Sequence, residues 1–215
     1  HYLRKIVGDD AFYKSLELYL KTNQFKSVEI ENLRLAFEAV TGEDMHWFFD
    51  EWFLNSGYPK LDINYSYDAD SLRVNISQKQ NTGKGLIYRL PMKIDVWYGK
   101  SANYYNIVLS KKSQTFSFKA NGKPDLIDAD AERAVLCEKT ENKTADNYIF
   151  QYTNTPLYTQ RYEALIKLAE LQKTNPSAKK CLINALHDNA YHIREFAIRK
   201  LEIPKADTAK IYATI

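Results

Sequence analysis

The histidines come first, because two of them at the right spacing can hold a metal ion. The sequence has 4 histidines, and His187 and His192 are close together in it. They are five residues apart, which places them about 140° apart around a helix and not on one face. This spacing predicts surface or packing histidines, and we assign no metal to them.

His46 offers a second possible ligand set, with Glu43 three residues before it and Asp50 four residues after it. Residues at these spacings share one face of a helix. Acidic side chains near a helical histidine are frequent by chance, so we interpret this group as ordinary surface charge. His1, the first residue, is equally uninformative about a metal.

Other patterns that could carry chemistry have simpler interpretations. Asp125, Asp128, Asp130 and Glu132 offer oxygen ligands for calcium but do not follow EF-hand spacing, so they predict a solvated strand end. Gly83-Lys84-Gly85 predicts a turn rather than a phosphate-binding loop. The aromatic group Trp97, Tyr98, Tyr104 and Tyr105 could form a sugar or peptide platform, although core filling is the favoured interpretation.

Nucleophilic and nucleotide-dependent chemistry have no candidate motif. No serine lies in a G-x-S-x-G elbow, and the glycine patterns of nucleotide-binding loops are missing from the sequence. Cys137 and Cys181 are far apart and form no CxxC pair, so neither a disulfide framework nor a structural zinc site is supported.

The spacing of apolar residues, which indicates the helices and strands that would position these side chains, changes twice along the sequence. Over residues 1–60 apolar residues recur every three or four positions, which predicts helices. Over 61–150 the period is two, which predicts strands, and over 151–215 it returns to the helical value. The predicted fold is therefore α+β and multidomain: helices, then an antiparallel β-sandwich, then helices.

The first region ends in a strongly apolar helix. Asp9 or Asp10 is predicted to cap an early helix and Gly42 to end a later one. Glu43 and Asp44 then open a helix with an apolar stripe. The stripe comprises Met45, Phe48, Phe49, Trp52 and Phe53. We expect it to pack against another part of the protein and to promote self-association where that part is missing.

The second region contains seven predicted strands. Residues 61–67 and 72–76 alternate in polarity and predict an antiparallel hairpin. The others are predicted at 90–98, 103–110, 115–119, 126–129 and 134–138, with a turn at Asn121-Gly122. Seven short strands in about eighty residues are typical of a small β-sandwich.

The third region contains predicted helices around residues 162–169, 182–186 and 193–201. Asn175-Pro176 and Asp188-Asn189-Ala190 separate them. The pattern has the form of a HEAT-type repeat, which needs about three stacked repeats to cover its apolar faces. Together with the start at His1, this leads us to expect a fragment of a longer chain.

Composition excludes two classes of protein. The net charge of +3, from 30 basic and 27 acidic residues, is far below that of a dedicated nucleic-acid binder. No apolar run approaches the roughly 18 residues of a membrane span. With 45% hydrophobic residues the chain can bury a core.

One ordered set of residues resembles a known family. Gly8-Asp9-Asp10-x-Phe12 is followed by Leu20, by Thr41-Gly42 and by Phe48-Phe49-x-x-Trp52-x-x-x-x-Gly57-x-Pro59-x-Leu61. This order resembles the end of the catalytic domain of the aminopeptidase N family of zinc metallopeptidases, the gluzincin aminopeptidases. The resemblance implies a thermolysin-like catalytic domain ending over 1–60, a β-sandwich domain over 61–150 and the start of a HEAT-like domain over 151–215.

The resemblance also implies an activity for a parent protein. Family members remove N-terminal residues from peptides with zinc held by an H-E-x-x-H helix and a distant glutamate. His-Glu does not occur in this sequence, so we assign it no catalytic, cofactor-binding or metal residue. Zinc and peptide substrates are expected to belong to the full-length parent, whose remaining catalytic domain would pack on the Met45 to Phe53 stripe.

Two alternatives remain from the sequence alone. One is a HEAT-type scaffold that binds other proteins, and the other is a zinc-less relative that keeps the architecture of the family. An H-E-x-x-H motif upstream of His1 would favour the peptidase. The compartment, cytoplasmic or periplasmic, stays undetermined.

Overall fold

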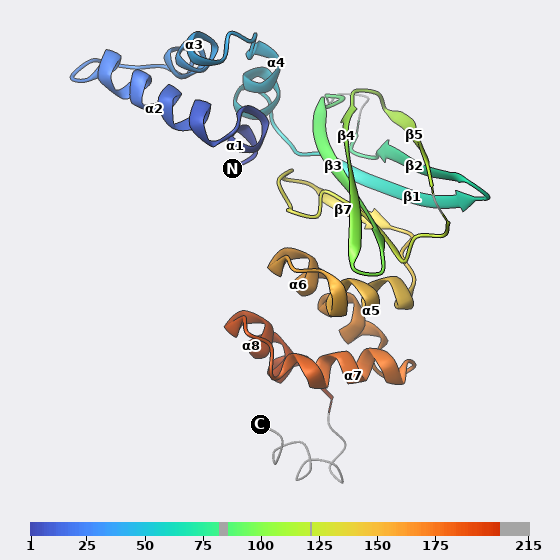
Figure 1. Cartoon of the computed structure of the whole chain (residues 1–215). Coiled ribbons are helices and arrows are strands. Elements are labelled where there is room, and N and C mark those ends of the chain that lie inside the picture. The colour runs from blue at the N-terminus through green and yellow to red at the C-terminus, as the bar shows by residue number, and fades with distance from the viewer. Residues whose placement is uncertain (82–85, 121, 203–215) are drawn as a thin grey trace. The chain divides into compact units, whose positions relative to one another are not determined.

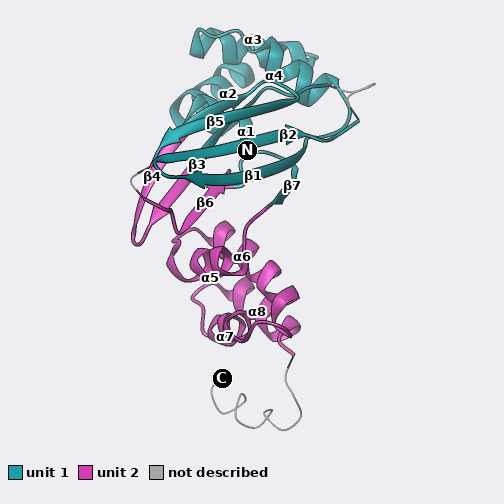
Figure 2. Cartoon of the chain, turned by 90° about the vertical axis from the view of Figure 1, so that its right-hand side faces the viewer, with its two compact units in different colours: residues 1–93, 106–119, 133–141 teal, residues 94–105, 120–132, 142–215 magenta. Residues whose placement is uncertain are grey.

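A computed structural model describes residues 1–81, 86–120 and 122–202. The chain divides into two compact units (Figure 2). Unit 1 comprises residues 1–93, 106–119 and 133–141, and unit 2 comprises 94–105, 120–132 and 142–215. The three regions and boundaries derived from the sequence stay a prediction.

Unit 1 begins with helices, as the sequence predicted (Figure 1). They are α1 (Tyr2–Val7), α2 (Asp9–Asn23), α3 (Ile30–Thr41), α4 (His46–Phe49) and the π-helix η1 (Asp50–Leu54). Gly42 ends α3 with a left-handed φ of 72°, which confirms the predicted stop. The predicted aspartate cap of α2 is wrong. Gly8 holds the cap position, and Asp9 instead pairs with Arg4 at 2.6 Å.

The apolar helix of unit 1 differs from the single helix predicted. It begins at His46, whose backbone N–H donates to Asp44 Oδ1 at 2.9 Å. After Phe49 it widens into η1, a turn that hydrophobic period alone does not distinguish from an α-helix. It ends at Leu54, before the predicted break at Asn55 to Pro59.

A four-stranded sheet follows, in the order β5-β2-β1-β7. Its strands are β1 (Lys60–Asp68), β2 (Ser71–Gln78), β5 (Ser113–Lys119) and β7 (Glu138–Glu141). The predicted hairpin is confirmed, with Ile63 opposite Ile76. β7 is a correction, because it pairs parallel with β1 and lies at 138–141 instead of 134–138. It follows a strand of another sheet, so no hairpin turn sets its direction.

A three-stranded sheet has the order β4-β3-β6. Its strands are β3 (Leu90–Tyr98), β4 (Ser101–Leu109) and β6 (Leu126–Ala129). The predicted bounds of 90–98 and 126–129 are confirmed, and Ile94 lies opposite Ala129 in an antiparallel pair. The predicted turn at Gly83-Lys84-Gly85 lies outside the described residues, as does Asn121 of the other turn.

Four helices complete the described part of unit 2 (Figure 1). They are α5 (Ala145–Asn154), α6 (Tyr158–Leu171), α7 (Pro176–Ala185) and α8 (Tyr191–Lys200). Leu165, Leu168 and Leu182 are fully buried in their shared core. No helix of the described chain combines the length and apolar character that crossing a membrane requires.

Helix α5 is the element that the sequence analysis missed, since residues 145–150 were assigned to the strand region. The Thr144 hydroxyl accepts from the Asn147 backbone N–H, and Asn147 Oδ1 accepts from the Thr144 N–H at 2.9 Å. This reciprocal cap is a readable helix start. The predicted break at Asn175-Pro176 is confirmed, since the Asn175 side chain caps α7.

Candidate functional site

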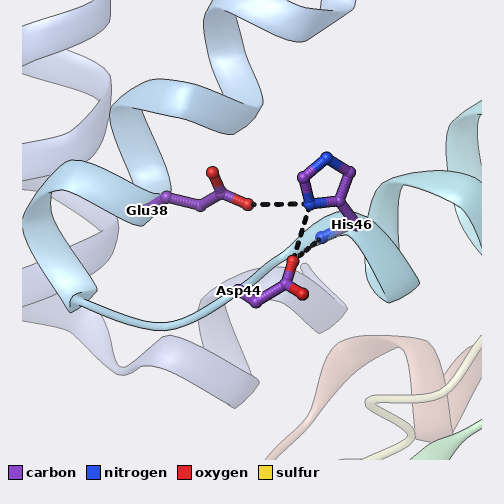
Figure 3. A group of neighbouring side chains, drawn as sticks. All are labelled: Glu38, Asp44 and His46. Atoms are coloured by element: carbon purple, nitrogen blue, oxygen red, sulfur yellow. Dashed lines mark hydrogen bonds and ion pairs between the residues drawn. The ribbon is translucent and has the colours of Figure 1, made fainter.

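His46 in unit 1 lies in a group of possible metal ligands (Figure 3). His46 Nδ1 is 2.7 Å from Asp44 Oδ1 and 3.5 Å from Glu38 Oε1. Glu38 comes from α3, and the other two residues from the segment that starts α4. The predicted companions Glu43 and Asp50 are not the contacts of His46. Because α4 begins only at His46, Glu43 is not on a shared helix face with it.

A cation of the protein already occupies this group. Arg34 Nη1 lies 3.1 Å from His46 Nδ1 and 2.5 Å from Glu38 Oε1, and Arg34 also pairs with Glu31. Its side chain is 6% exposed. Glu38 Oε1 also accepts from the Met45 N–H at 2.9 Å. Zinc requires ligand atoms that can turn toward it, and a fixed guanidinium among them repels it. The residues therefore do not fit a zinc ion.

The arrangement instead joins α3 to the start of α4. The guanidinium of Arg34 lowers the pKa of Glu31 through a hydrogen bond. The backbone N–H of His46 does the same for the pKa of Asp44. Hydrogen bonds that favour the ionised carboxylate keep Glu31 and Asp44 charged to lower pH than usual, beside one buried cation. This is the chemistry of a structural ion network.

The prediction of a solvated strand end at Asp125, Asp128, Asp130 and Glu132 is wrong for two of these acids, because Asp128 is fully buried and Asp130 is only 6% exposed. Asp125 Oδ2 accepts from the Gly99 N–H at 2.7 Å. Asp128 accepts from Lys143 Nζ at 2.6 Å and from Gln160 Nε2 at 2.8 Å. Among the residues that the structure describes, these four acids do not form one possible metal-ligand group.

The other sequence candidates also lie apart. His192 Nδ1 is 3.7 Å from Glu195, and neither His187 nor His192 joins a possible metal-ligand group within the described ranges. Trp97 is buried whereas Tyr104 is 57% exposed, so the aromatic set does not share one surface. Cys181 is buried, and burial raises the pKa of its thiol.

The apolar stripe is largely covered by this chain itself. Met45, Phe48 and Phe49 are at most 4% exposed, and Phe48 packs against Tyr2 of α1 with ring centroids 5.9 Å apart. Phe53 is 49% exposed. Of the stripe, Phe53 is thus the member with the most surface left for an outside partner.

The end of α2 and the segment that joins it to α3 expose apolar side chains. Leu20 belongs to the ordered set that resembles the aminopeptidase N family, whereas the sequence alone did not point to Phe25 or Val28. Leu20 is 63% exposed, Val28 is 43% exposed, and Phe25 is fully exposed with a positive φ of 62°. Leu20 and Val28 line a hollow of about 460 Å³, together with Lys21 and Lys26. We call Leu20, Phe25 and Val28 the apolar loop surface. A positive φ is costly for a bulky residue, and here it accompanies an exposed ring.

Comparison with known proteins identifies relatives of part of the chain. No family model matches it. Aminopeptidase N of Lactococcus lactis subsp. lactis is 30% identical over 104 residues, which are 46% of this chain and 12% of that protein. Part of this chain is homologous to aminopeptidase N family proteins.

Further aminopeptidases extend the relation. Aminopeptidase N of Haemophilus influenzae is 29% identical over 80 residues, covering 37% of this chain and 9% of that protein. Puromycin-sensitive aminopeptidase of Caenorhabditis elegans is 21% identical over 119 residues, covering 53% and 13%. The aligned segments cover 9% to 13% of the length of these aminopeptidases.

A solved structure shares the fold over nearly the whole chain. Legionella pneumophila aminopeptidase A matches with a TM-score of 0.76 and 14% identity, covering 96% of this chain and 25% of that one. The fold likeness therefore extends well beyond the segment that is similar in sequence.

Proposed function

We propose that this chain is a non-catalytic C-terminal portion of a zinc-dependent aminopeptidase, which removes N-terminal residues from peptides. The homology to aminopeptidase N proteins carries this proposal. It is joined by a sequence observation, since no His-Glu pair, and hence no H-E-x-x-H helix, occurs in the chain. The part played here is that of a scaffold for a catalytic centre located elsewhere.

The elements can be assigned within such a parent. In this proposal α1 to η1 form the end of the catalytic domain, the two sheets form a β-sandwich domain, and α5 to α8 begin a HEAT-like domain. The fold likeness over 96% of the chain supports the assignment, because it includes all three kinds of region.

Zinc belongs in this proposal to residues outside the present sequence. The histidine with two carboxylate neighbours, His46, has the Arg34 guanidinium 3.1 Å from its Nδ1. A site that already holds a cation offers no place for the metal that activates water. The residues of this chain therefore support the catalytic domain without entering its chemistry.

The partner of unit 1 would be the remaining catalytic domain. Exposed apolar side chains on a folded chain are a common mark of a covered interface. The apolar loop surface and Phe53 supply such side chains, and they replace the wider stripe that the sequence suggested. The neighbouring Lys21 and Lys26 would favour an acidic rim on the partner.

Zinc content and peptidase assays test the catalytic part of the proposal. The purified chain should retain no stoichiometric zinc after gel filtration, measured by atomic emission. It should not release p-nitroaniline from aminoacyl p-nitroanilides, with or without added zinc. Zinc-dependent turnover that survives in the wild-type chain and disappears in His46→Ala would overturn the proposal and locate a centre at His46.

Light scattering tests the partner surface. Without its partner the chain should self-associate at high concentration, and the double variant Leu20→Ser/Phe25→Ser should shift it toward monomer. Tyr191→Ser is a matched control, because Tyr191 is 59% exposed in unit 2. A wild-type chain that is monomeric throughout contradicts the surface assignment and leaves the zinc assay unaffected.

A further inference from the structure

One carboxyl group in unit 1 is buried with one of its two oxygens lacking a hydrogen-bond partner. Glu51 lies in η1 and is 9% exposed. Its Oε1 accepts a hydrogen bond from the backbone N–H of Arg89 at 2.8 Å. Arg89 is the residue before the first residue of β3. The Oε2 of Glu51 is buried without a hydrogen-bond partner. Such atoms are rare in folded proteins and call for an explanation.

The residue that follows Glu51, Trp52, packs in an aromatic cluster. Its ring packs on Tyr2 and on Tyr88, both with centroids 5.4 Å apart from it. The Tyr2 hydroxyl donates to the Pro91 carbonyl at 2.8 Å. One joint thus connects η1 and α1 to residues 88–91, all within unit 1. An ionised carboxylate is poorly solvated in such a place.

The charged groups around the carboxyl give little compensation. The charge of Arg89 lowers the pKa of Glu51, whereas the charge of Asp50 raises it. Tyr88 is also close enough for its phenol to interact electrostatically with Glu51. The Arg89 guanidinium lies over the Trp47 ring, 4.4 Å from its centroid. Burial dominates and raises the pKa of Glu51 to about 7.

We propose that Glu51 is a protonation-dependent latch, whose neutral carboxyl holds η1 to the start of β3 and whose ionised form loosens that joint. In the neutral form Oε1 keeps the Arg89 N–H bond and Oε2 carries the proton. In the ionised form Oε2 becomes a charge with no donor in an apolar joint. The inference concerns unit 1 alone and does not depend on the proposed aminopeptidase role.

The direction with pH follows from the two states. The pKa of Glu51 is about 7 in the folded chain, against 4.5 as its ordinary value. The folded chain therefore holds the proton more tightly, so this group contributes stability fully below about pH 4.5 and loses it as pH rises through about 7. The opposite trend would come from an ordinary salt-bridged carboxylate.

The first experiment compares Glu51→Gln with the wild type in thermal unfolding at several pH values. Glutamine keeps an acceptor for Arg89 and cannot ionise, so the difference in Tm between the two proteins should change by roughly 5 °C from acid to alkaline pH. Glu43→Gln removes an exposed carboxyl of the same unit and should keep the wild-type pH dependence. A constant difference between Glu51→Gln and the wild type overturns the latch.

The second experiment needs no variant. The side-chain carboxyl carbon of Glu51, followed by NMR in the wild-type chain, should titrate with a midpoint near 7. Amide signals of Arg89 and the indole signal of Trp52 should move with the same midpoint, since both lie in the joint. A midpoint close to that of an exposed glutamate, or neighbours that do not follow it, overturns the proposal.

Discussion

Two buried carboxyl groups, one in each unit, are held in opposite ways. Glu51 in unit 1 has one backbone N–H and an oxygen without a partner. Asp128 in unit 2 is fully buried and receives Lys143 Nζ at 2.6 Å and Gln160 Nε2 at 2.8 Å. The Lys143 side chain is itself only 1% exposed.

The difference teaches that burial alone does not set the charge of an acid. At Asp128 a buried lysine and an amide replace the lost water, so the ion pair is matched although both ions are desolvated. At Glu51 no hydrogen-bond donor replaces the water around Oε2, and burial raises the pKa of the group to about 7. A matched pair makes a rigid connection, whereas an unmatched acid makes one that depends on pH.

Breaking the matched pair should have the largest effect. Asp128→Asn removes the buried carboxylate that accepts from Lys143 Nζ at 2.6 Å and should lower the free energy of unfolding by about 3 to 5 kcal/mol. Urea denaturation followed by circular dichroism measures it. Asp146→Asn, an exposed acid in α5, is the control and should change stability by less than about 0.5 kcal/mol.

The double variant Asp128→Leu/Lys143→Met sharpens this prediction. Removing both charges should recover part of the loss, because the double variant no longer buries either ion of the pair. If Asp128→Asn behaves like its exposed control, the pair is not a matched buried ion pair and the comparison with Glu51 fails.

A neutral bond in the unit 1 joint should matter less than the charged pair. Tyr2→Phe removes the donor to the Pro91 carbonyl but keeps the ring on Trp52, so we expect a loss of about 1.5 kcal/mol. Tyr13→Phe is a control, since Tyr13 is 55% exposed. The same loss in both variants would show that the Tyr2 hydroxyl has no special role. The pH dependence of unfolding should persist in Tyr2→Phe, because Glu51 is intact.

The exposed cap of α5 should have the smallest effect. Thr144→Ala removes the acceptor of the Asn147 N–H, and a helix cap is worth about 1 kcal/mol. Because no buried charge is involved, this loss should not change with pH in the neutral range, where exposed carboxylates and lysines keep their charge. Urea midpoints at two pH values check it, and a loss as large as that of Asp128→Asn would contradict the ranking.

Local patterns predicted most elements of the fold. The helices of the first region, the β1/β2 hairpin and the bounds of β3 and β6 follow from hydrophobic period and turn residues. Each of these depends on contacts close in sequence, which is why the pattern carries them. The cap of α5 at Thr144 was also present locally, and the alternating strand pattern before it was extended too far.

The sequence predicted the candidate site less well. The neighbours of His46 proved to be Glu38 and Arg34, eight and twelve residues away along the chain across the turn that follows α3. Spacing on a single helix cannot find such partners, because the turn sets them. The sequence carried one weak signal of this network, because Glu31 and Glu38 stand three residues before and four after Arg34 and so share its helix face.

By itself the sequence determined the order of helices, strands and helices, the lack of a His-Glu motif and the resemblance to aminopeptidase N, since these depend on residue type and near neighbours. The tertiary structure alone decided that β7 runs parallel to β1, that Arg34 fills the His46 group, and that Glu51 and Asp128 have such different partners. The physical reason is that desolvation and hydrogen bonding act between groups far apart in sequence, and only folding brings those groups together.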